Sequence, residues 1–349
     1  MILYIIKRTL FGLIAMLVGM MLIFWILSLS NVDPARAIYG EKADEKVLQK
    51  FRETQHLDHS VAVQMLYYLN DLSPLHFVDE KENINQYRWT LFRMGTIKLV
   101  LHKPDFGVSY SYSEPVISMV GNAFLATLVL ALCAMFFGVV VGVLLGIVSS
   151  RYYGLWQDQL IQSVCTFFIS LPSFITAIIL SFILAFSLGA WTGLEIQGGL
   201  FEIDDWGNEV VRLRNLILPA LALGSRPIAV ICQMTRSAFV EVAHQDYMRT
   251  AKSKGLSEYY ISWIHQMRNT LNPILTTVSG WFASVLTGAV FVESVFNYKG
   301  LGDLCVSALN HYDRPLILAC SFLFVLVFVT INLLADLVNA WNDPRIQIQ

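Results

Sequence analysis

The 349-residue sequence is 56% hydrophobic and only 14% charged, with a mean hydropathy of +0.57. Soluble domains carry about 25% charged residues, so this composition excludes an ordinary soluble protein and indicates an integral membrane protein. The 24 Lys and Arg against 26 Asp and Glu give a net charge of −2, which favours no nucleic-acid partner. The five cysteines lie mostly in apolar runs without C-x-x-C pairing, so we expect small buried side chains rather than a disulfide framework.

The first element is an uncharged run from Thr9 to Asn31, which follows the basic residues Lys7 and Arg8. The apolar core of a signal peptide has about 7–15 residues, whereas this run is long enough to cross a bilayer. We therefore expect an uncleaved membrane-spanning helix within residues 1–31. Its basic end is expected in the cytoplasm, because cytoplasmic flanks are enriched in Lys and Arg.

The next segment, residues 32–115, is polar and is predicted to lie outside the membrane, in the periplasm. Amphipathic spacing predicts helices over Glu41–Glu53 and Val61–Leu72. The second of these helices should stop before Pro74, because a proline disfavours helix for its predecessor. Basic residues at helical spacing also predict a helix over Arg88–Leu101.

Residues 116–349 form the predicted membrane core, in which five further apolar stretches predict five more spans. Their bounds are Glu114–Arg151, Asp158–Glu195, Leu216–Phe239, Ile274–Val292 and Pro315–Trp341. Leu171-Pro172 is expected to kink the second of these stretches, because a proline inside a helix removes a backbone hydrogen bond. Six spans place both termini on one side, and the short segments assigned to the cytoplasm are rich in Lys and Arg. The expected fold is an all-α polytopic membrane protein with six transmembrane helices.

One long polar interval, residues 241–273, separates the fourth and fifth predicted spans. Helical character over Tyr247–Lys254 ends at Gly255, and a second helix is predicted to restart at Leu256-Ser257-Glu258. Ser257 suits the N-cap of that helix, because a serine oxygen accepts the free N–H groups of a first helical turn. Two short amphipathic helices joined at a glycine and held between spans predict a docking surface.

Within this interval, Ala251 and Gly255 are one helical turn apart, a spacing typical of close helix packing. Arg249, Lys252 and Lys254 accompany them on the side assigned to the cytoplasm. This combination favours a surface that contacts a partner over simple packing within the chain.

Ionisable residues inside apolar runs indicate functional positions, because a charge in hydrocarbon is costly. Arg226 lies part-way through the fourth predicted span. It either pairs with a carboxylate of a neighbouring helix or subunit, or faces a water-filled path and contacts an anionic substrate group. Arg236 lies nearer the inner face, where we expect its side chain to reach the interface. Interfacial solvation is expected for Glu293 and Asp336, and Glu293 joins Arg226 as a candidate residue of the translocation path.

Enzyme signatures are missing from the sequence: there is no H-E-x-x-H, no G-x-S-x-G and no P-loop G-x-x-x-x-G-K-[ST]. None of the seven histidines has a second histidine at metal-binding helical spacing. We therefore expect a chain that is not catalytic by itself, binds no metal or cofactor, and obtains any ATP-derived energy from another chain.

The tract Asp246–Pro273 resembles the cytoplasmic coupling loop of ABC-importer permeases, specifically the dipeptide/oligopeptide subgroup. Ala251 and Gly255 match the family pattern, whereas Arg249-Thr250 replaces its Glu-Ala start and Pro273 comes later than usual. Further marks of the family occur in order along the chain: Asp33-Pro34-Ala35-Arg36, Asp105-Phe106-Gly107, Leu171-Pro172-Ser173-Phe174, Leu218-Pro219-Ala220, Val292-Glu293-Ser294-Val295-Phe296, Gly300-Leu301-Gly302 and Asp343-Pro344-Arg345-Ile346. The stretch Leu75–Lys103 is longer than is usual in the family.

The resemblance implies a pore-forming permease subunit of a type I ABC importer in the bacterial cytoplasmic (inner) membrane, with both termini cytoplasmic. It implies four partners: a second homologous permease, two cytoplasmic ATPase subunits that bind the ATP, and an external solute-binding protein. The implied substrates are dipeptides or oligopeptides, with nickel, glutathione or another small solute as alternatives. The residues implied in ATPase coupling are Arg249, Ala251, Gly255, Leu256 and Ser257.

Two other classes of protein remain as alternatives. A stand-alone secondary transporter would need no ATPase, but the sequence shows no inverted repeat of the kind common in such transporters. A membrane enzyme would need catalytic groups that the motifs do not supply.

Overall fold

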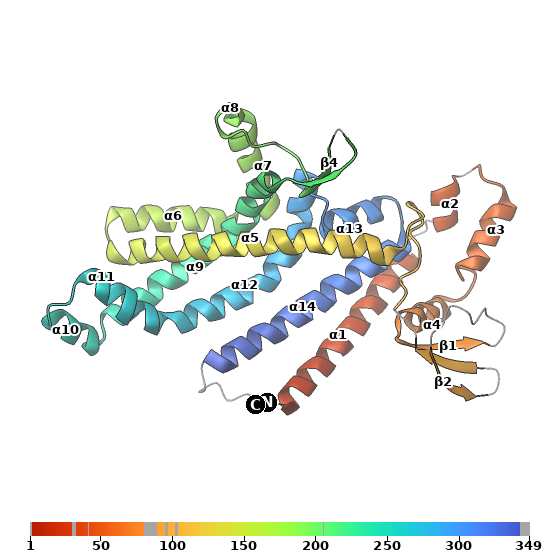
Figure 1. The fold of residues 1–349 in the computed structure, drawn as a ribbon, viewed down its shortest axis with the longest axis horizontal. Helices are drawn as coiled ribbons and strands as arrows, with labels where there is room; N and C mark the ends of the chain where they lie inside the picture. Colours follow the sequence, from red (N-terminus) through yellow and green to blue (C-terminus); the bar gives the residue numbers. More distant parts are fainter. Residues whose placement is uncertain are drawn as a thin grey trace. The chain divides into compact units, whose positions relative to one another are not determined.

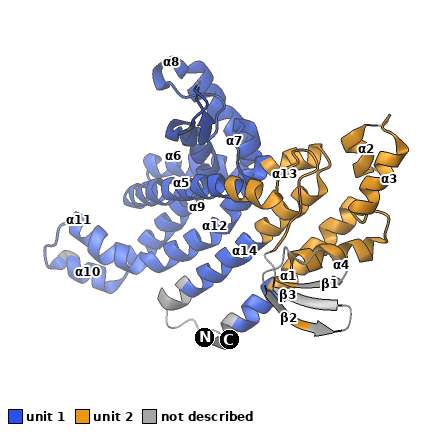
Figure 2. Cartoon of the chain, turned by 45° about the vertical axis from the view of Figure 1, so that its right-hand side comes forward, with its two compact units in different colours: residues 1–12, 123–303, 326–349 blue, residues 13–122, 304–325 orange. Residues whose placement is uncertain are grey.

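In a computed structural model, the structure describes residues 2–29, 33–40, 42–79, 89–94, 97–101, 104–204 and 206–342. Helices dominate this part of the chain, as Figure 1 shows. The chain divides into two compact units, coloured separately in Figure 2. Unit 1 comprises residues 1–12, 123–303 and 326–349, and unit 2 comprises residues 13–122 and 304–325.

Within the described residues, five helices are long and apolar enough to cross a membrane, and a bent helix pair makes a sixth if it counts as one span. The five helices are α1 (Ile2–Leu29), α5 (Val116–Arg151), α9 (Ile217–Ala243), α12 (Met267–Phe296) and α14 (Arg314–Asn342). These positions confirm the predicted membrane-spanning architecture.

The bent pair consists of α6 (Trp156–Ser170) and α7 (Ser173–Leu180), the latter continued by the π-helical turn η2 (Ser181–Ser187). The chain turns by 113° between the two halves of this pair. The break falls at Leu171 and Pro172, where Leu171 has an extended ψ of 133° as expected before a proline. The predicted kink at Leu171-Pro172 is therefore confirmed.

Unit 1 is held together by a close contact between α5 and α9. Gly142 and Gly146 lie one helical turn apart on α5, facing the α9 backbone. A Cβ atom on Gly142 would lie 2.8 Å from the Ile228 carbonyl oxygen, and one on Gly146 would lie 2.7 Å from that of Cys232. Small residues at this spacing let helix backbones approach without a strong hydrophobic driving force between them. A larger side chain at either glycine would force α5 away from α9.

The core of unit 1 is apolar and draws on α5, α7, α9 and α12. Its most buried members are Leu130, Ala131, Ala134, Ala177, Ala220, Ala222, Ala289 and Val292. The connection from η2 to α9 includes α8 (Gly189–Thr192), strands β4 (Phe201–Ile203) and β5 (Glu209–Val211), which pair antiparallel, and the 3₁₀ turn η3 (Leu213–Leu216). The connection between η2 and α9 thus contains a small hairpin.

Unit 2 contains three short helices and a three-stranded sheet. The helices are α2 (Pro34–Tyr39), α3 (Glu45–Thr54) and α4 (Val61–Leu72), and the strands are β1 (Leu75–Asp79), β2 (Trp89–Met94) and β3 (Ile97–Leu101). The strand order is β1-β3-β2, and both pairings are antiparallel. The helix α13 (Leu301–Asn310) begins at the end of unit 1 and continues into unit 2.

The predicted helices of unit 2 have mixed outcomes. The prediction for Val61–Leu72 is confirmed, and α4 ends before Pro74 as expected. The helix predicted over Glu41–Glu53 begins only at Glu45, where the Asp44 carboxylate accepts a hydrogen bond from the Lys46 N–H. The helix predicted over Arg88–Leu101 is wrong, because this stretch forms β2 and β3. Its Trp, Thr, Phe, Ile and Val residues favour strands, β2 pairs with β3, and β3 also pairs with β1, which satisfies backbone groups of both strands.

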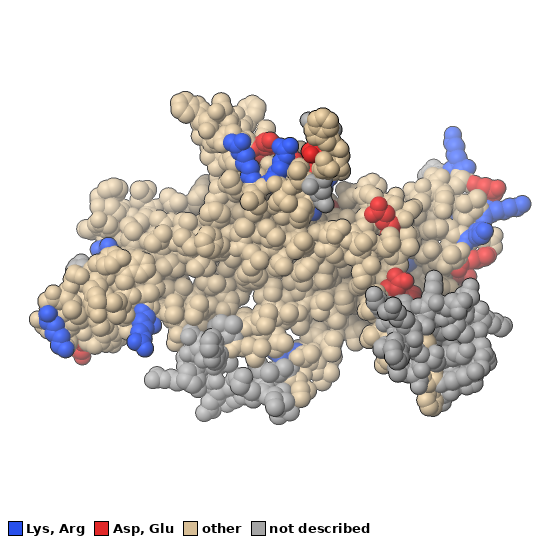
Figure 3. Space-filling view, in the orientation of Figure 1, with Lys and Arg blue, Asp and Glu red and all other residues tan. Residues whose placement is uncertain are grey.

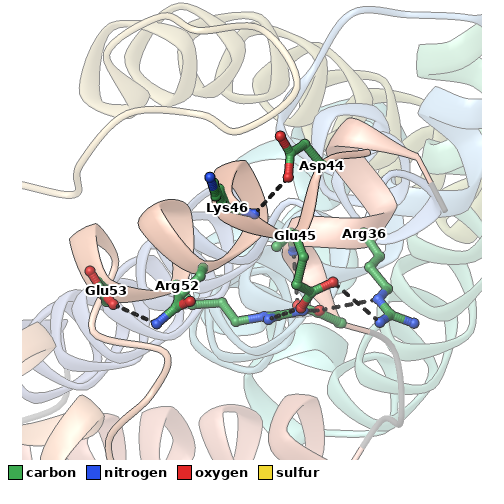
Figure 4. A network of polar contacts seen from close by, with 9 residues as sticks. Arg36, Asp44, Glu45, Lys46, Arg52 and Glu53 are labelled. Atoms are coloured by element: carbon green, nitrogen blue, oxygen red, sulfur yellow. Dashed lines mark hydrogen bonds and ion pairs between the residues drawn. The ribbon is translucent and has the colours of Figure 1, made fainter. Parts of the chain in front are cut away.

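A polar network fixes α2 against α3 (Figure 4). Asp33 caps α2 by accepting a hydrogen bond from the Ala35 N–H at 3.1 Å, and Arg52 pairs with Asp33 at 2.5 Å and with Glu45 at 3.0 Å. Partial burial opposes ionisation of Asp33, but the bonds from Arg52 and Ala35 hold the pKa of Asp33 below its usual range. The Asp33-Pro34-Ala35-Arg36 motif therefore has a structural role as a helix start. The motif Asp343–Ile346 lies outside the described residues.

Candidate functional site

The polar interval between α9 and α12 forms two short helices, as predicted. The helix α10 (Asp246–Ser253) is followed by Gly255 with φ of +74°, a left-handed conformation that glycine adopts readily. The helix α11 (Glu258–Tyr260) leads through the π-helical turn η4 (Ile261–Gln266) into α12. Ser257 accepts a hydrogen bond from the Tyr260 N–H at 3.3 Å. The predicted break at Gly255 and the Ser257 cap are both confirmed.

The five residues predicted to couple to an ATPase divide into two groups. Ala251 is buried, packing with Met248 and Ile261 in a small apolar cluster against Val242. The remaining four, Arg249, Gly255, Leu256 and Ser257, are exposed. A few separate basic side chains are visible on the surface at this end of the molecule in Figure 3. The segment thus presents a charged outer surface and is attached to unit 1 through its inner side.

A cavity of about 500 Å³ lies beside this attachment. It is lined by the turn between α5 and α6, by the end of α9, and by Met248, Ile261 and Gln266 of the two-helix segment. The cavity leaves open space between part of the segment and the α5–α6 turn. Open space of this kind allows a segment to shift without disrupting a packed core.

The most strongly bonded charged pair in unit 1 joins the α5–α6 turn to α9. Arg236 donates from Nε to Asp158 Oδ1 at 2.7 Å and from Nη2 to Oδ2 at 2.6 Å. Asp158, with 3% of its side chain exposed, also accepts from the Ser149 hydroxyl at 2.5 Å and the Gly154 N–H at 3.0 Å. The expectation that Arg236 reaches the interface stays a prediction; the structure adds that a buried carboxylate binds its guanidinium in a bidentate arrangement. Asp158 was not among the residues predicted to be functional.

Arg226 has no such partner. No carboxylate among the described residues lies within ion-pair distance, and its buried Nε forms no hydrogen bond to them. The guanidinium carbon lies 5.9 Å from the centroid of the Trp281 ring on α12, which provides a weak cation–π contact. One alternative for Arg226 was an ion pair with a carboxylate of a neighbouring helix or subunit. Within the described residues of this chain, no such ion pair is observed.

Glu293 lies at the end of α12 and is fully buried. Its carboxylate accepts hydrogen bonds from the Thr127 hydroxyl at 2.6 Å, the Gly302 N–H at 2.7 Å and the Asp303 N–H at 3.2 Å. The last two are free N–H groups in the first turn of α13, which a negative charge stabilises. Interfacial solvation of Glu293 is therefore wrong: the residue links α5, α12 and α13. Its place in a translocation path stays a prediction.

Replacing Glu293 should destabilise unit 1. The loss should be larger when the whole carboxylate is removed than when one oxygen acceptor is kept. Glu293→Ala removes three hydrogen bonds and should lower the free energy of unfolding by about 2–4 kcal/mol. Glu293→Gln keeps one carbonyl oxygen facing the α13 N–H groups and should cost less than half of that. Thermal unfolding in detergent measures both. Equal stability of the alanine variant and the wild type would contradict this role.

Asp336 was expected to be solvated at the interface. It also forms an ion pair within the chain. Its carboxylate pairs with Arg8 of α1 at 2.5 Å, while both side chains keep part of their surface exposed. This pair joins two membrane-spanning helices near their ends. No group of three or more His, Cys, Asp or Glu residues that could hold a metal ion occurs in the described part of the chain.

Helices long and apolar enough to cross a membrane, with an exposed two-helix segment between α9 and α12, are what a polytopic membrane protein requires. The chain belongs to the family described as "Binding-protein-dependent transport system inner membrane component", whose model matches residues 138–348. The N-terminal model of the same family matches residues 1–131. The chain is therefore a multi-pass permease subunit of an ABC importer, a transport component that is not catalytic by itself.

Relatives of known function are similar along nearly the whole chain. The glutathione transport system permease protein GsiC of Salmonella typhimurium LT2 is 32% identical over 344 residues, which cover 99% of this chain and 98% of the relative. The GsiC protein of Escherichia coli K12 is 31% identical over 344 residues, with the same shares covered. The family resemblance inferred from the coupling loop is thus confirmed.

The fold is similar to that of a solved transporter. An inward-facing structure of the MetNI methionine ABC transporter superposes with a TM-score of 0.54 at 16% sequence identity, covering 66% of this chain and 99% of that chain. At this identity the similarity concerns the fold alone. It confirms the expected ABC importer permease fold.

Proposed function

We propose that the chain forms, with a second similar permease, the membrane path of an ATP-driven importer of dipeptides or oligopeptides. Two cytoplasmic ATPase subunits supply the energy, and an external solute-binding protein delivers the peptide. The relatives named above support the substrate class, because glutathione is itself a tripeptide. Nickel or another small solute is the alternative cargo within the same family.

The observation that carries the substrate class is the unpaired Arg226. A guanidinium part-way along a membrane-spanning helix is costly unless it has a partner or water. Among the described residues, no carboxylate pairs with the guanidinium of Arg226 and no acceptor binds its Nε–H. Trp281 supplies only a weak contact. A peptide brings a carboxylate, to which a guanidinium can donate two parallel hydrogen bonds. Arg226 is therefore proposed to contact the peptide carboxylate in the path.

Arg226→Gln should weaken uptake of a peptide with a free carboxylate by about tenfold or more, because a charge-assisted hydrogen bond is lost. The same peptide amidated at its C-terminus lacks that carboxylate, so its uptake should differ little between the wild type and the variant. Concentration-dependent uptake into vesicles that contain the complete importer measures both.

The matched control is Arg212→Gln, which removes an exposed arginine from β5–η3 that pairs with Glu202 at 3.0 Å. It should leave uptake of both peptides unchanged. An Arg226→Gln variant with unchanged affinity for the free-carboxylate peptide would argue against this role. An equal loss for both peptides would assign Arg226 to the path in general rather than to the carboxylate, and would also overturn the proposal.

Residues 241–273 are proposed to couple the permease to the ATPases. Arg249, Leu256 and Ser257 are exposed and would enter a cleft of an ATPase subunit, while Ala251 anchors the segment to unit 1. Closure of the ATPases on ATP would move the segment and rock the spans between inward- and outward-facing arrangements, and hydrolysis would reset them. The cavity beside the segment supports such a movement, because it leaves open space next to Met248 and Ile261.

The topology that fits this function places both termini and residues 241–273 in the cytoplasm, and residues 32–115 in the periplasm. The Lys and Arg residues near α1, α5 and α10 support it, because short cytoplasmic segments are enriched in these residues. A stand-alone secondary transporter is the alternative from another class. Uptake by the isolated chain without ATP would favour that alternative.

A further inference from the structure

A short turn in unit 2, residues 311–313, joins α13 to the start of α14. Its last residue, Asp313, is fully buried and accepts hydrogen bonds from the Ser109 hydroxyl at 2.5 Å and the Ser111 N–H at 3.0 Å. The same carboxylate accepts from the Leu316 N–H at 3.3 Å, which satisfies a free donor in the first turn of α14. These bonds fix the turn and the helix ends on either side of it.

Two thiols meet across this turn. Cys305 lies on α13 and Cys320 lies near the start of α14, and both belong to unit 2. Their side chains are hydrogen-bonded to each other. Thiols that point toward each other can be bridged by small side-chain rotations, whereas thiols that point apart require movement of the backbone. The pair is therefore arranged for a disulfide bond, although both cysteines are free in this structure.

The thiol pair lies beside a segment that the proposed topology assigns to the periplasm. Ser109 and Ser111, which precede α5, bind Asp313 of the turn, and the Tyr112 hydroxyl lies 3.1 Å from the Ser307 hydroxyl of α13. These contacts place the turn on the same side as residues 32–115. The periplasm is oxidising, so disulfides form and persist there. The compartment of the pair thus depends on the topology given under the proposed function.

The two thiols differ in their access to an external reagent. Cys305 is partly exposed, whereas Cys320 is fully buried. The hydrogen bond from Cys320 holds the pKa of Cys305 below its usual value, against the effect of burial. A lower pKa increases the thiolate fraction, and the thiolate is the nucleophile in thiol–disulfide exchange. Cys305 is thus placed to react first, and Cys320 is placed to attack it afterwards.

A second thiol pair, in unit 1, provides an internal comparison. Cys165 on α6 and Cys232 on α9 are also hydrogen-bonded to each other. Both are buried, and apolar side chains such as Leu145 and Phe168 surround them. An oxidant dissolved in water does not reach thiols in such a place, so we expect this pair to stay reduced.

We propose that Cys305 and Cys320 form an intramolecular disulfide in the periplasm by exchange with the disulfide of a periplasmic oxidant. The Cys305 thiolate attacks one sulfur of that disulfide, whose S–S bond breaks and whose other sulfur leaves as a thiolate. The Cys320 thiolate then attacks Cys305 Sγ in the mixed disulfide, and the second sulfur of the oxidant leaves. Two electrons pass to the oxidant, and the protons of the two thiols end on its two sulfurs. The new bond closes residues 305–320 into a loop and fastens α13 to α14.

The redox state of the cysteines in the full-length chain tests the site. Cells that express the complete importer are quenched with acid and alkylated with N-ethylmaleimide before lysis, so that free thiols are blocked and disulfides keep their pairing. Peptides of the purified chain are identified by mass spectrometry with and without reductant. We expect a peptide linked through Cys305 and Cys320 in most chains, and alkylated Cys165 and Cys232.

Variants separate the disulfide from folding. Reductant should lower the midpoint of thermal unfolding of the wild type by several degrees, because opening the loop gives the unfolded chain more freedom. It should not change the midpoint of Cys305→Ala, which replaces the partly exposed thiol and has no such loop to open. The matched control, Cys232→Ala, removes a buried cysteine of the other pair and should keep the link between Cys305 and Cys320.

Labelling from outside separates this proposal from the topology. After mild reduction of Cys320→Ala, a maleimide that does not cross the inner membrane should label Cys305 in cells whose outer membrane has been opened. Labelling only after the inner membrane is opened would overturn the disulfide together with the periplasmic assignment.

Two results would overturn the disulfide alone. The first is that Cys305 is labelled from outside, but Cys305 and Cys320 are both alkylated in the wild type even after exposure of the cells to oxidised glutathione. The second is a disulfide from Cys305 to any residue other than Cys320, which would show that the two thiols are not each other's partners.

Discussion

Asp158→Asn is expected to lower the free energy of unfolding by about 3–5 kcal/mol, the typical cost of leaving one charge of a buried pair without its partner. In the wild type both oxygens of Asp158 are bonded to Arg236, and Ser149 and Gly154 donate to the same carboxylate. The variant keeps the shape of the side chain but removes its charge. Thermal or denaturant unfolding in detergent gives the change in stability.

A double replacement separates the charge from the packing at this position. Asp158→Leu combined with Arg236→Met removes both charges and should recover most of the stability lost by either replacement alone, because apolar pairs often replace buried ion pairs at little cost. Asp336→Asn is the matched control: its pair with Arg8 is more exposed, so the loss should stay below about 1 kcal/mol. Similar losses for Asp158→Asn and Asp336→Asn would contradict the account of the buried pair.

Gly255→Val is expected to reduce ATP-driven uptake by at least tenfold while the chain still inserts and folds. Gly255 has φ of +74°, and a Cβ atom there would meet no atom within 4 Å, so the penalty arises from the backbone alone. A side chain in the left-handed region costs about 1–2 kcal/mol, and a β-branched one is the least tolerated. The join between α10 and α11 should then change direction. Uptake into vesicles that contain the complete importer, with expression and thermal stability measured in parallel, tests this.

Gly255→Asn is the control for this prediction, because asparagine tolerates positive φ better than other residues with a side chain. It adds a side chain of similar size at the same place and should retain much of the uptake. Normal uptake by Gly255→Val would show that the conformation of the join does not matter for coupling. Equal losses in both variants would assign the effect to bulk at the surface rather than to backbone conformation.

Local patterns in the sequence were sufficient to place most helices. Uninterrupted apolar runs predicted the spans, Pro172 predicted the sharp bend, and Gly255 with Ser257 predicted the two-helix segment. Each of these features depends on residues within a few positions of one another. The stretch Arg88–Leu101 was mispredicted because its basic residues fit helical spacing, whereas pairing of β2 with β3, and of β3 with the earlier strand β1, gives it a strand conformation.

The roles of charged residues could not be read from local pattern. Arg236 bonds Asp158, which lies 78 positions earlier, and Glu293 bonds Thr127, which lies 166 positions earlier. The unpartnered state of Arg226 likewise depends on which helices surround it. An aspartate in the first turn of the helix that follows a long apolar run, such as Asp158, is a signal that could have pointed to a buried ion pair. The sequence alone did not show which arginine would complete it.

Co-purification from the native membrane tests the central claim, that this permease couples to separate ATPases through residues 241–273. The tagged chain is extracted in mild detergent, and the proteins that accompany it are identified by mass spectrometry. We expect recovery of ATPase subunits with P-loops and of a second six-span permease, with the ATPases depleted for Gly255→Val and retained for Gly255→Asn. Recovery of the chain alone, still able to transport without ATP, would contradict it.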